Sequence, residues 1–264
     1  MDISVDLDAP AIALSICAHP DDTEFGAGAT LAKWAAQGTR ICHVVCTDGS
    51  KGTWDPNADI TQLISTRANE QAAAQRILGG TGSDVWFLGA VDGELENSAV
   101  LRRELVALVR TIRPDVIFGH DPWKRYRLHP DHRAAGFLTI DAIVAARDTF
   151  FFPELGLTPH RAHTLLLFEA DEADHFEDVA ESLPTKVEAL LAHTSQLRST
   201  MFINDPAAPE AEAIVVPKDS PIKSVAELRG KKVALNKGSN VHFLLVKALE
   251  KAVELGGGNT ADFA

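Results

Sequence analysis

Apolar runs alternate with segments of helical periodicity over most of the chain. Residues 11–18 form a continuous apolar run, which is typical of a strand that is buried on both faces of a parallel sheet. The segments of helical period begin near capping residues and end at glycine or before proline. The strands predicted in this way are 11–18, 41–47, 85–88, 116–118 and 164–168. The predicted helices are 24–37, 65–78, 130–146 and 184–196, and one more that Ser98 caps and that stops before Pro114.

This regular alternation of strand and helix predicts a doubly wound, mostly parallel α/β sheet with helices on both faces, a Rossmann-like arrangement. In such folds a ligand binds beyond the carboxyl ends of the strands. Polar residues directly after the predicted strands are therefore the first candidates for chemistry.

The pattern changes near residue 204. Residues 204–213 are rich in Pro, Ala and Glu, which is typical of a linker. Residues 214–264 contain short apolar runs and a predicted helix from 239 to about 255, which indicates a small α/β appendage. We therefore expect a main domain at 1–203, a linker and a C-terminal appendage.

Composition narrows the class of protein and its partners. The chain has 264 residues, of which 45% are hydrophobic and 23% charged, as in ordinary soluble globular proteins. It has no apolar run of the roughly 20 residues that span a bilayer, and its acidic start lacks the features of a secretory signal, which favours the cytoplasm. The net charge of −12 argues against nucleic acid or an anionic membrane as the main partner. We expect a small-molecule partner, and leave a homo-oligomer open.

Three ionisable side chains follow the first predicted strand in the sequence H-P-D-D, here called the first H-P-D turn (residues 19–22). Charged groups at the mouth of a buried strand are costly unless something compensates them. A bound cation does so, because imidazole and carboxylate groups are good ligands for zinc and similar metals. Two of the three groups His19, Asp21 and Asp22 can coordinate, and the third then remains close by as a base.

A second cluster, H-P-D-H, follows the strand that ends near Gly119, and is here called the second H-P-D turn (residues 129–132). His132 would complete a set of two histidines and one carboxylate, with positions left open for water and substrate. Zn²⁺ and Fe²⁺ both suit that set. The alternative is that each turn is an ordinary helix cap with solvated histidines. We favour the metal site because two such charge clusters follow strands of one sheet.

The motif H-P-D-D-x-E together with H-P-D-H resembles the LmbE-like, or PIG-L, family of zinc-dependent N-deacetylases. The resemblance covers about residues 11–203 and includes T-D-G-S-K-G at 47–52, R-A-N-E at 67–70 and H-T-S-Q at 193–196. It implies an LmbE-type α/β fold and hydrolysis of the acetamide of an N-acetylglucosamine-containing or related small substrate. By matching position, it implies that zinc is bound by His19, Asp22 and His132, and that Asp21 is the general base.

The same resemblance implies roles for residues around the second H-P-D turn. His129 would be the electrophilic or acid partner of the reaction, and Asp131 would orient it. Arg67 matches a position that contacts substrate. Some relatives carry Tyr two residues before the first His of this motif, whereas this chain has Arg127 there with Tyr126 beside it. We expect both to contact substrate, and a solvated surface loop is the alternative.

A second function comes from the C-terminal region. Residues 214–251 resemble a segment of periplasmic solute-binding proteins for aliphatic sulfonates. The sequence K-G-S-N at 237–240 would place backbone N–H groups at a helix start, which suits anions. The alternative to a deacetylase is therefore a small-anion binding protein that acts through this segment.

Overall fold

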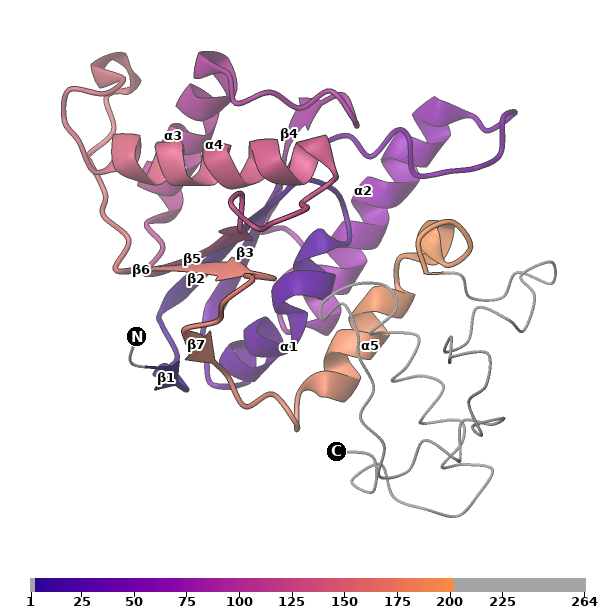
Figure 1. Cartoon of the computed structure of the whole chain (residues 1–264), viewed down its shortest axis with the longest axis horizontal. Helices are drawn as coiled ribbons and strands as arrows, with labels where there is room; N and C mark the ends of the chain where they lie inside the picture. The colour runs from indigo at the N-terminus through magenta and orange to yellow at the C-terminus, as the bar shows by residue number, and fades with distance from the viewer. Residues whose placement is uncertain (1–2, 202–264) are drawn as a thin grey trace. The chain divides into compact units, whose positions relative to one another are not determined.

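The structure is a computed structural model, and it describes residues 3–201 (Figure 1). The chain divides into two compact units, residues 1–195 and 196–264, and the fold below is that of the first. The predicted linker at 204–213 and the predicted appendage at 214–264, with its sulfonate-protein resemblance, lie outside the described residues.

A five-stranded sheet forms the centre of the first unit, and all of its neighbouring strands are parallel. The strands, in spatial order, are β4 (Val85–Ala90), β3 (Arg40–Thr47), β2 (Ile12–Cys17), β5 (Val116–His120) and β6 (Thr164–Phe168). From β2 the chain runs outward through β3 and β4, and then returns to build β5 and β6 on the other side. The sheet is doubly wound, as predicted, and its switch point lies between β2 and β5, where ligand sites of such sheets form.

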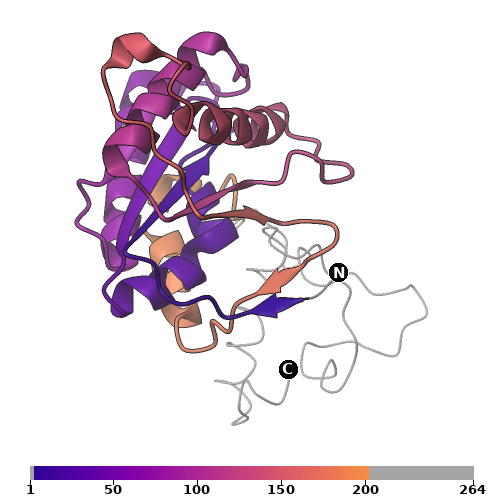
Figure 2. The same cartoon turned by 90° about the vertical axis from the view of Figure 1, so that its left-hand side faces the viewer.

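Helices cover both faces of the sheet, and each face has its own apolar core (Figures 1 and 2). Leu31 and Trp34 of α1 pack with Ala74 and Ala189 on one face. Leu105 and Leu138 pack on the other. The first face carries α1 (Asp22–Ala36), α2 (Ile60–Ile77) and α5 (Leu183–Leu191), and the second carries α3 (Ala99–Ile112) and α4 (Pro130–Ala146).

The elements predicted within residues 3–201 are all present, with differences at their ends that have local causes. Helix α2 begins at Ile60, five residues before the predicted start, because the Asp59 side chain accepts a hydrogen bond from the Gln62 N–H and caps it. Helix α5 ends at Leu191, and a 3₁₀ turn, η2 (Thr194–Gln196), replaces its predicted last turn. Short elements were not predicted, namely β1 (Ser4–Val5), which pairs with β7 (His175–Phe176), and the 3₁₀ turn η1 (Pro153–Leu155).

Among residues 3–201, no helix combines the length and apolarity that crossing a membrane requires.

Candidate active site

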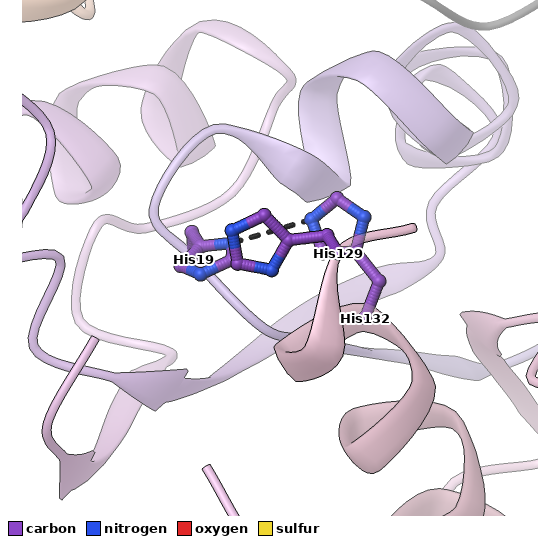
Figure 3. Close-up of side chains that lie close together, drawn as sticks. All are labelled: His19, His129 and His132. Atoms are coloured by element: carbon purple, nitrogen blue, oxygen red, sulfur yellow. Dashed lines mark hydrogen bonds between the residues drawn. The ribbon is translucent and has the colours of Figure 1, made fainter. Parts of the chain in front are cut away.

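The two H-P-D turns meet at the carboxyl edge of the sheet, beside the switch point. His19 follows β2, Asp22 is the first residue of α1, and His132 lies in the first turn of α4. The His132 Nε2 atom lies 3.2 Å from Asp22 Oδ1 and 3.3 Å from His19 Nδ1. The His19 Nδ1 atom lies 3.3 Å from Asp22 Oδ2. Figure 3 shows the imidazoles of His19, His129 and His132 gathered at this point.

The separation of the His19 and His132 nitrogens fits a shared cation, and each nitrogen faces one oxygen of Asp22. Donor atoms about 2.1 Å from a tetrahedral ion lie roughly 3.4 Å from one another. Three groupings of His and Asp side chains in the described part of the chain have ligand atoms close enough to share an ion. They are His19 with His129 and His132, Asp22 with His120 and His132, and His19 with Asp92 and Asp131.

The second ring nitrogen of His19 faces carboxylates. Its Nε2 lies 3.0 Å from Asp131 Oδ2 and 3.3 Å from Asp92 Oδ1. A proton on Nε2 satisfies these acceptors and leaves the Nδ1 lone pair directed toward Asp22 and His132, as in histidines that bind metals. Burial opposes a charge on His19, but its bonds to the three aspartates raise its pKa well above the usual range. The cluster therefore has an excess of buried negative charge, which a cation would compensate.

Asp131 does not contact the His129 side chain through its carboxylate. Its carboxylate accepts hydrogen bonds from the backbone N–H groups of Gly93 at 2.6 Å and Leu95 at 3.1 Å, as well as from His19. Burial would raise the pKa of Asp131, but these bonds lower it to about 2. The Nδ1 of His129 instead accepts the backbone N–H of Asp131 at 3.2 Å. The orientation of His129 by the Asp131 side chain stays a prediction.

His129 caps α4 and is exposed at the edge of the cluster. Its ring centroid lies 4.6 Å from that of His19 and 4.7 Å from that of His132. Burial and the charges of these two histidines lower the pKa of His129, which favours the neutral ring. A neutral imidazole there can donate one hydrogen bond toward a bound substrate.

Asp21 lies between the two predicted ligands of the first turn but belongs to none of the three groupings. Its backbone is left-handed, with φ at 100° and ψ at −27°. The carboxylate is buried, and one oxygen lies 3.4 Å from Arg67 Nη2. Burial raises the pKa of Asp21 to about 6, which suits a base that works near neutral pH.

Arg67 is buried and uses its guanidinium to hold the loops around Asp21. Its Nη2 donates to the Pro20 carbonyl at 2.7 Å, and its Nη1 donates to the Gly49 carbonyl at 2.9 Å. Gly49 belongs to the T-D-G-S-K-G segment that the sequence singled out. A contact between Arg67 and substrate stays a prediction.

Arg127 and Tyr126 lie on the loop between β5 and α4 and differ in exposure. Arg127 is buried, pairs with Glu169, and donates to the carbonyl of Asp121 at 3.1 Å and that of Phe168 at 3.4 Å. Tyr126 has a left-handed backbone, with φ at 60°, and 82% of it is exposed. Arg127 thus anchors the loop that presents Tyr126 to solvent. The predicted contacts of both with substrate stay predictions.

Two residues of the cluster were not found from the sequence, His120 and Asp92. His120 ends β5, its Nε2 lies 3.3 Å from Asp22 Oδ2, and its ring stacks on His132 with centroids 4.3 Å apart. Burial lowers the pKa of His120 to about 4. The predicted strand 116–118 ended two residues early, which hid the place of His120 at a strand end. Asp92 follows β4 and could have been found by the same rule.

The fold and the cluster define a class: a doubly wound α/β protein whose switch point carries His and Asp side chains that could hold a metal ion. A family model described as PIG-L: GlcNAc-PI de-N-acetylase matches residues 14–143. The diacetylchitobiose deacetylase of Thermococcus kodakarensis is 34% identical over 186 residues, which are 69% of this chain and 69% of that protein. The chain belongs to the LmbE-like, or PIG-L, family of deacetylases, which confirms the family expected from the two motifs.

Two further relatives are also deacetylases by name, and one of them is a solved structure with a similar fold. The structure of N,N'-diacetylchitobiose deacetylase from Pyrococcus horikoshii matches with a TM-score of 0.67 and 31% identity, over 71% of each chain. A 1D-myo-inositol 2-acetamido-2-deoxy-alpha-D-glucopyranoside deacetylase of Streptomyces avermitilis is 36% identical over 169 residues. The match to that protein covers 54% of this chain and 56% of the relative.

Proposed function

We propose that this chain is a metal-dependent hydrolase that removes an acetyl group from the amide nitrogen of an amino sugar or a related small N-acyl compound. Its relatives support this, since two of them are by name deacetylases of diacetylchitobiose and of a 2-acetamido sugar on inositol. The observation that carries the proposal is the meeting of His19, Asp22 and His132 within 3.3 Å, with the carboxylate of Asp21 beside them.

His19, Asp22 and His132 would hold the cation, and the two other carboxylates near His19 would fix the orientation of that ligand. We propose Zn²⁺, for which two histidines and one carboxylate are a common catalytic set, and Fe²⁺ suits the same donors. When bound, the cation would supply Lewis-acid polarisation of the amide carbonyl and would lower the pKa of a water toward about 7.

The side chains supply the proton transfers. Asp21 accepts the proton of the attacking water, since its carboxylate is next to the ligand set and is not itself needed as a ligand. His129, at the exposed edge, donates a hydrogen bond to the oxygen of the amide as negative charge develops on it. The departing nitrogen must gain a proton, because an amide anion leaves poorly. Either His129 or the newly protonated Asp21 can provide it.

The test is a screen for acetate release from N-acetyl amino sugars, from monosaccharides to N,N'-diacetylchitobiose, with and without a chelator. Protein purified without a metal-affinity tag is analysed for its elements at the same time. We expect about one Zn²⁺ or Fe²⁺ per chain, acetate release that the chelator abolishes, and loss of both in His132→Ala. Metal-loaded protein that releases no acetate from any of these acetamides would contradict the proposal. Anion binding through residues 214–251, the alternative function, would survive His132→Ala.

A further inference from the structure

Helix α2 holds the first H-P-D turn through two side chains that are one helical turn apart. Arg67 Nη2 donates to the Pro20 carbonyl at 2.7 Å, and Gln71 Oε1 accepts the backbone N–H of Asp21 at 2.9 Å. Residues at i and i+4 lie on one face of a helix, so both side chains reach the same turn. Both polar groups of the Pro20–Asp21 peptide bond are therefore held from α2.

The backbone at Asp21 requires such support. A φ of 100° is rare for any residue with a Cβ atom, and such a strained conformation persists only where the surroundings impose it. The direction of the Asp21 carboxylate depends on that φ. A relaxed turn would move the carboxylate away from its place beside the ligand set.

The side-chain amide of Gln71 is itself oriented by a buried carboxylate. Its Nε2 donates to Glu24 Oε1 at 2.9 Å and to His43 Nδ1 at 3.2 Å. A carboxylate accepts hydrogen bonds and an amide NH₂ donates them, so Glu24 decides which end of the Gln71 amide faces it. The other end, Oε1, must then face the N–H of Asp21.

Glu24 lies at ion-pair distance from His193. The Oε2 of Glu24 lies 3.3 Å from His193 Nε2, and both side chains are fully buried. Burial opposes a charge on His193, but Glu24 raises its pKa above the usual value, as in an ion pair. Glu70 fixes the segment that carries His193, since its carboxylate accepts the hydroxyl of Thr194 at 2.7 Å and the N–H of Ser195 at 2.8 Å.

We propose that Gln71, Glu24 and His193 are positioning residues for Asp21. His193 fixes Glu24, Glu24 orients the Gln71 amide, and Gln71 holds the backbone that aims the Asp21 carboxylate. A buried series of hydrogen-bonded polar side chains costs more free energy than an apolar core. Its presence here therefore indicates a functional role. The catalytic part of this inference rests on the proposed function. It also gives a role to the Glu of the first motif and to the His of H-T-S-Q, which bind no metal in the proposal above.

A matched pair of variants tests the inference, because α2 carries a second buried glutamine one turn further on. Gln75 is also fully buried, but its Nε2 donates to the Ile41 carbonyl at 2.8 Å and its Oε1 accepts the Gly82 N–H. We expect Gln71→Met to lower kcat on the order of 10²-fold, as small misplacements of catalytic groups do. Its KM and metal content stay unchanged. Gln75→Met should lower the melting temperature while kcat stays at the wild-type value.

Crystal structures of both metal-loaded variants add a readout that needs no activity. We expect Asp21 to leave its left-handed conformation in Gln71→Met and to keep it in Gln75→Met. An inactive wild-type protein with this difference in backbone would refute the proposed function and leave the positioning role standing. An unchanged Asp21 conformation in Gln71→Met, or an equal loss of kcat in both variants, would refute the positioning role.

His193 offers a second pair in case Gln71→Met does not fold. Gln at position 193 still presents a donor to Glu24, whereas Leu presents none. We expect His193→Gln to retain most of kcat and His193→Leu to lose on the order of 10²-fold, with KM unchanged in both. Equal kcat values in these two variants would refute the role of His193.

Discussion

The two H-P-D turns have the same three residues in sequence and different structures. In the first turn, Pro20 precedes a left-handed Asp21, and helix α1 begins only after it, at Asp22. In the second turn, His129 is the cap, Pro130 is the first residue of helix α4, and Asp131 lies within the first helical turn. The tripeptide does not encode one conformation. The surrounding elements decide whether its aspartate continues a helix or stands apart from one.

The two aspartates also differ in their electrostatics. The carboxylate of Asp21 accepts a hydrogen bond from Arg67 at the long distance of 3.4 Å, and burial raises its pKa to about 6. Asp131 accepts two backbone N–H groups and a histidine, and its pKa is lowered to about 2. A carboxylate with few donors is available to take a proton, whereas one with many donors is a fixed anion. Under the proposed function, the first motif thus supplies a base and the second an anchor.

The largest effect that follows from this difference concerns turnover. We expect Asp21→Asn to lower kcat by roughly 10²–10⁴-fold while the metal stays bound, because the amide cannot accept the proton of water. Asp131→Asn is the control, since it should act mainly through a weaker hold on His19, and so on metal affinity. Turnover is measured at saturating metal, together with metal content. A wild-type kcat in Asp21→Asn would remove Asp21 as the base.

The second effect is a pH dependence of opposite sign at the two turns, measured on metal-free protein. The folded-state pKa of Asp21, about 6, exceeds the ordinary 3.8, so the folded state keeps a proton that the unfolded state has lost. Stability is therefore lost as the pH rises from about 4 to about 6. For Asp131, with a pKa of about 2, stability is lost as the pH falls from about 4 to about 2.

Urea unfolding across this pH range checks both signs. Asp21→Asn should lack the loss between pH 4 and 6, and Asp131→Asn should lack the loss below pH 4, each on the order of 2 kcal/mol. Parallel curves for the wild type and the two variants would show that the two carboxylates are not shifted in opposite directions.

Much of the fold was open to prediction from the sequence because its strands are buried on both faces and its helices carry clear end signals. The apolar run before His19 identified β2, and Ser98 marked the start of α3. Periodicity gives no account of β1 and β7, which are two residues long and pair only with each other. The start of α2 was missed because its first turn is exposed and its cap, Asp59, follows a polar loop.

The part of the site that lies within the two short motifs was predictable from the sequence. The two motifs put His19, Asp22 and His132 forward, and the structure brings them together. The partners of each group come from distant segments: Gly93 and Leu95 for Asp131, and Gln71 for Asp21. Such pairings depend on how loops after different strands meet, which a pattern of residues along one chain does not contain. This is why the bond between Asp131 and His19 was not expected.

The smallest expected effect is a difference in stability that reports the backbone conformations at Asp21 and Asp131. Removing the carboxylate with Ala or with Gly changes the side chain similarly, so the difference in stability between the two variants reports the backbone at that position. At Asp21, where φ is 100°, Gly should be more stable than Ala by about 1 kcal/mol, because Ala keeps the left-handed strain. At Asp131, inside α4, the Gly variant should be less stable than the Ala variant by about 0.5–1 kcal/mol, because Gly weakens a helix.

Urea unfolding of the four metal-free variants gives both differences. The same sign at both turns would mean that the two H-P-D segments share one backbone conformation, and the distinction between base and anchor would then need another cause.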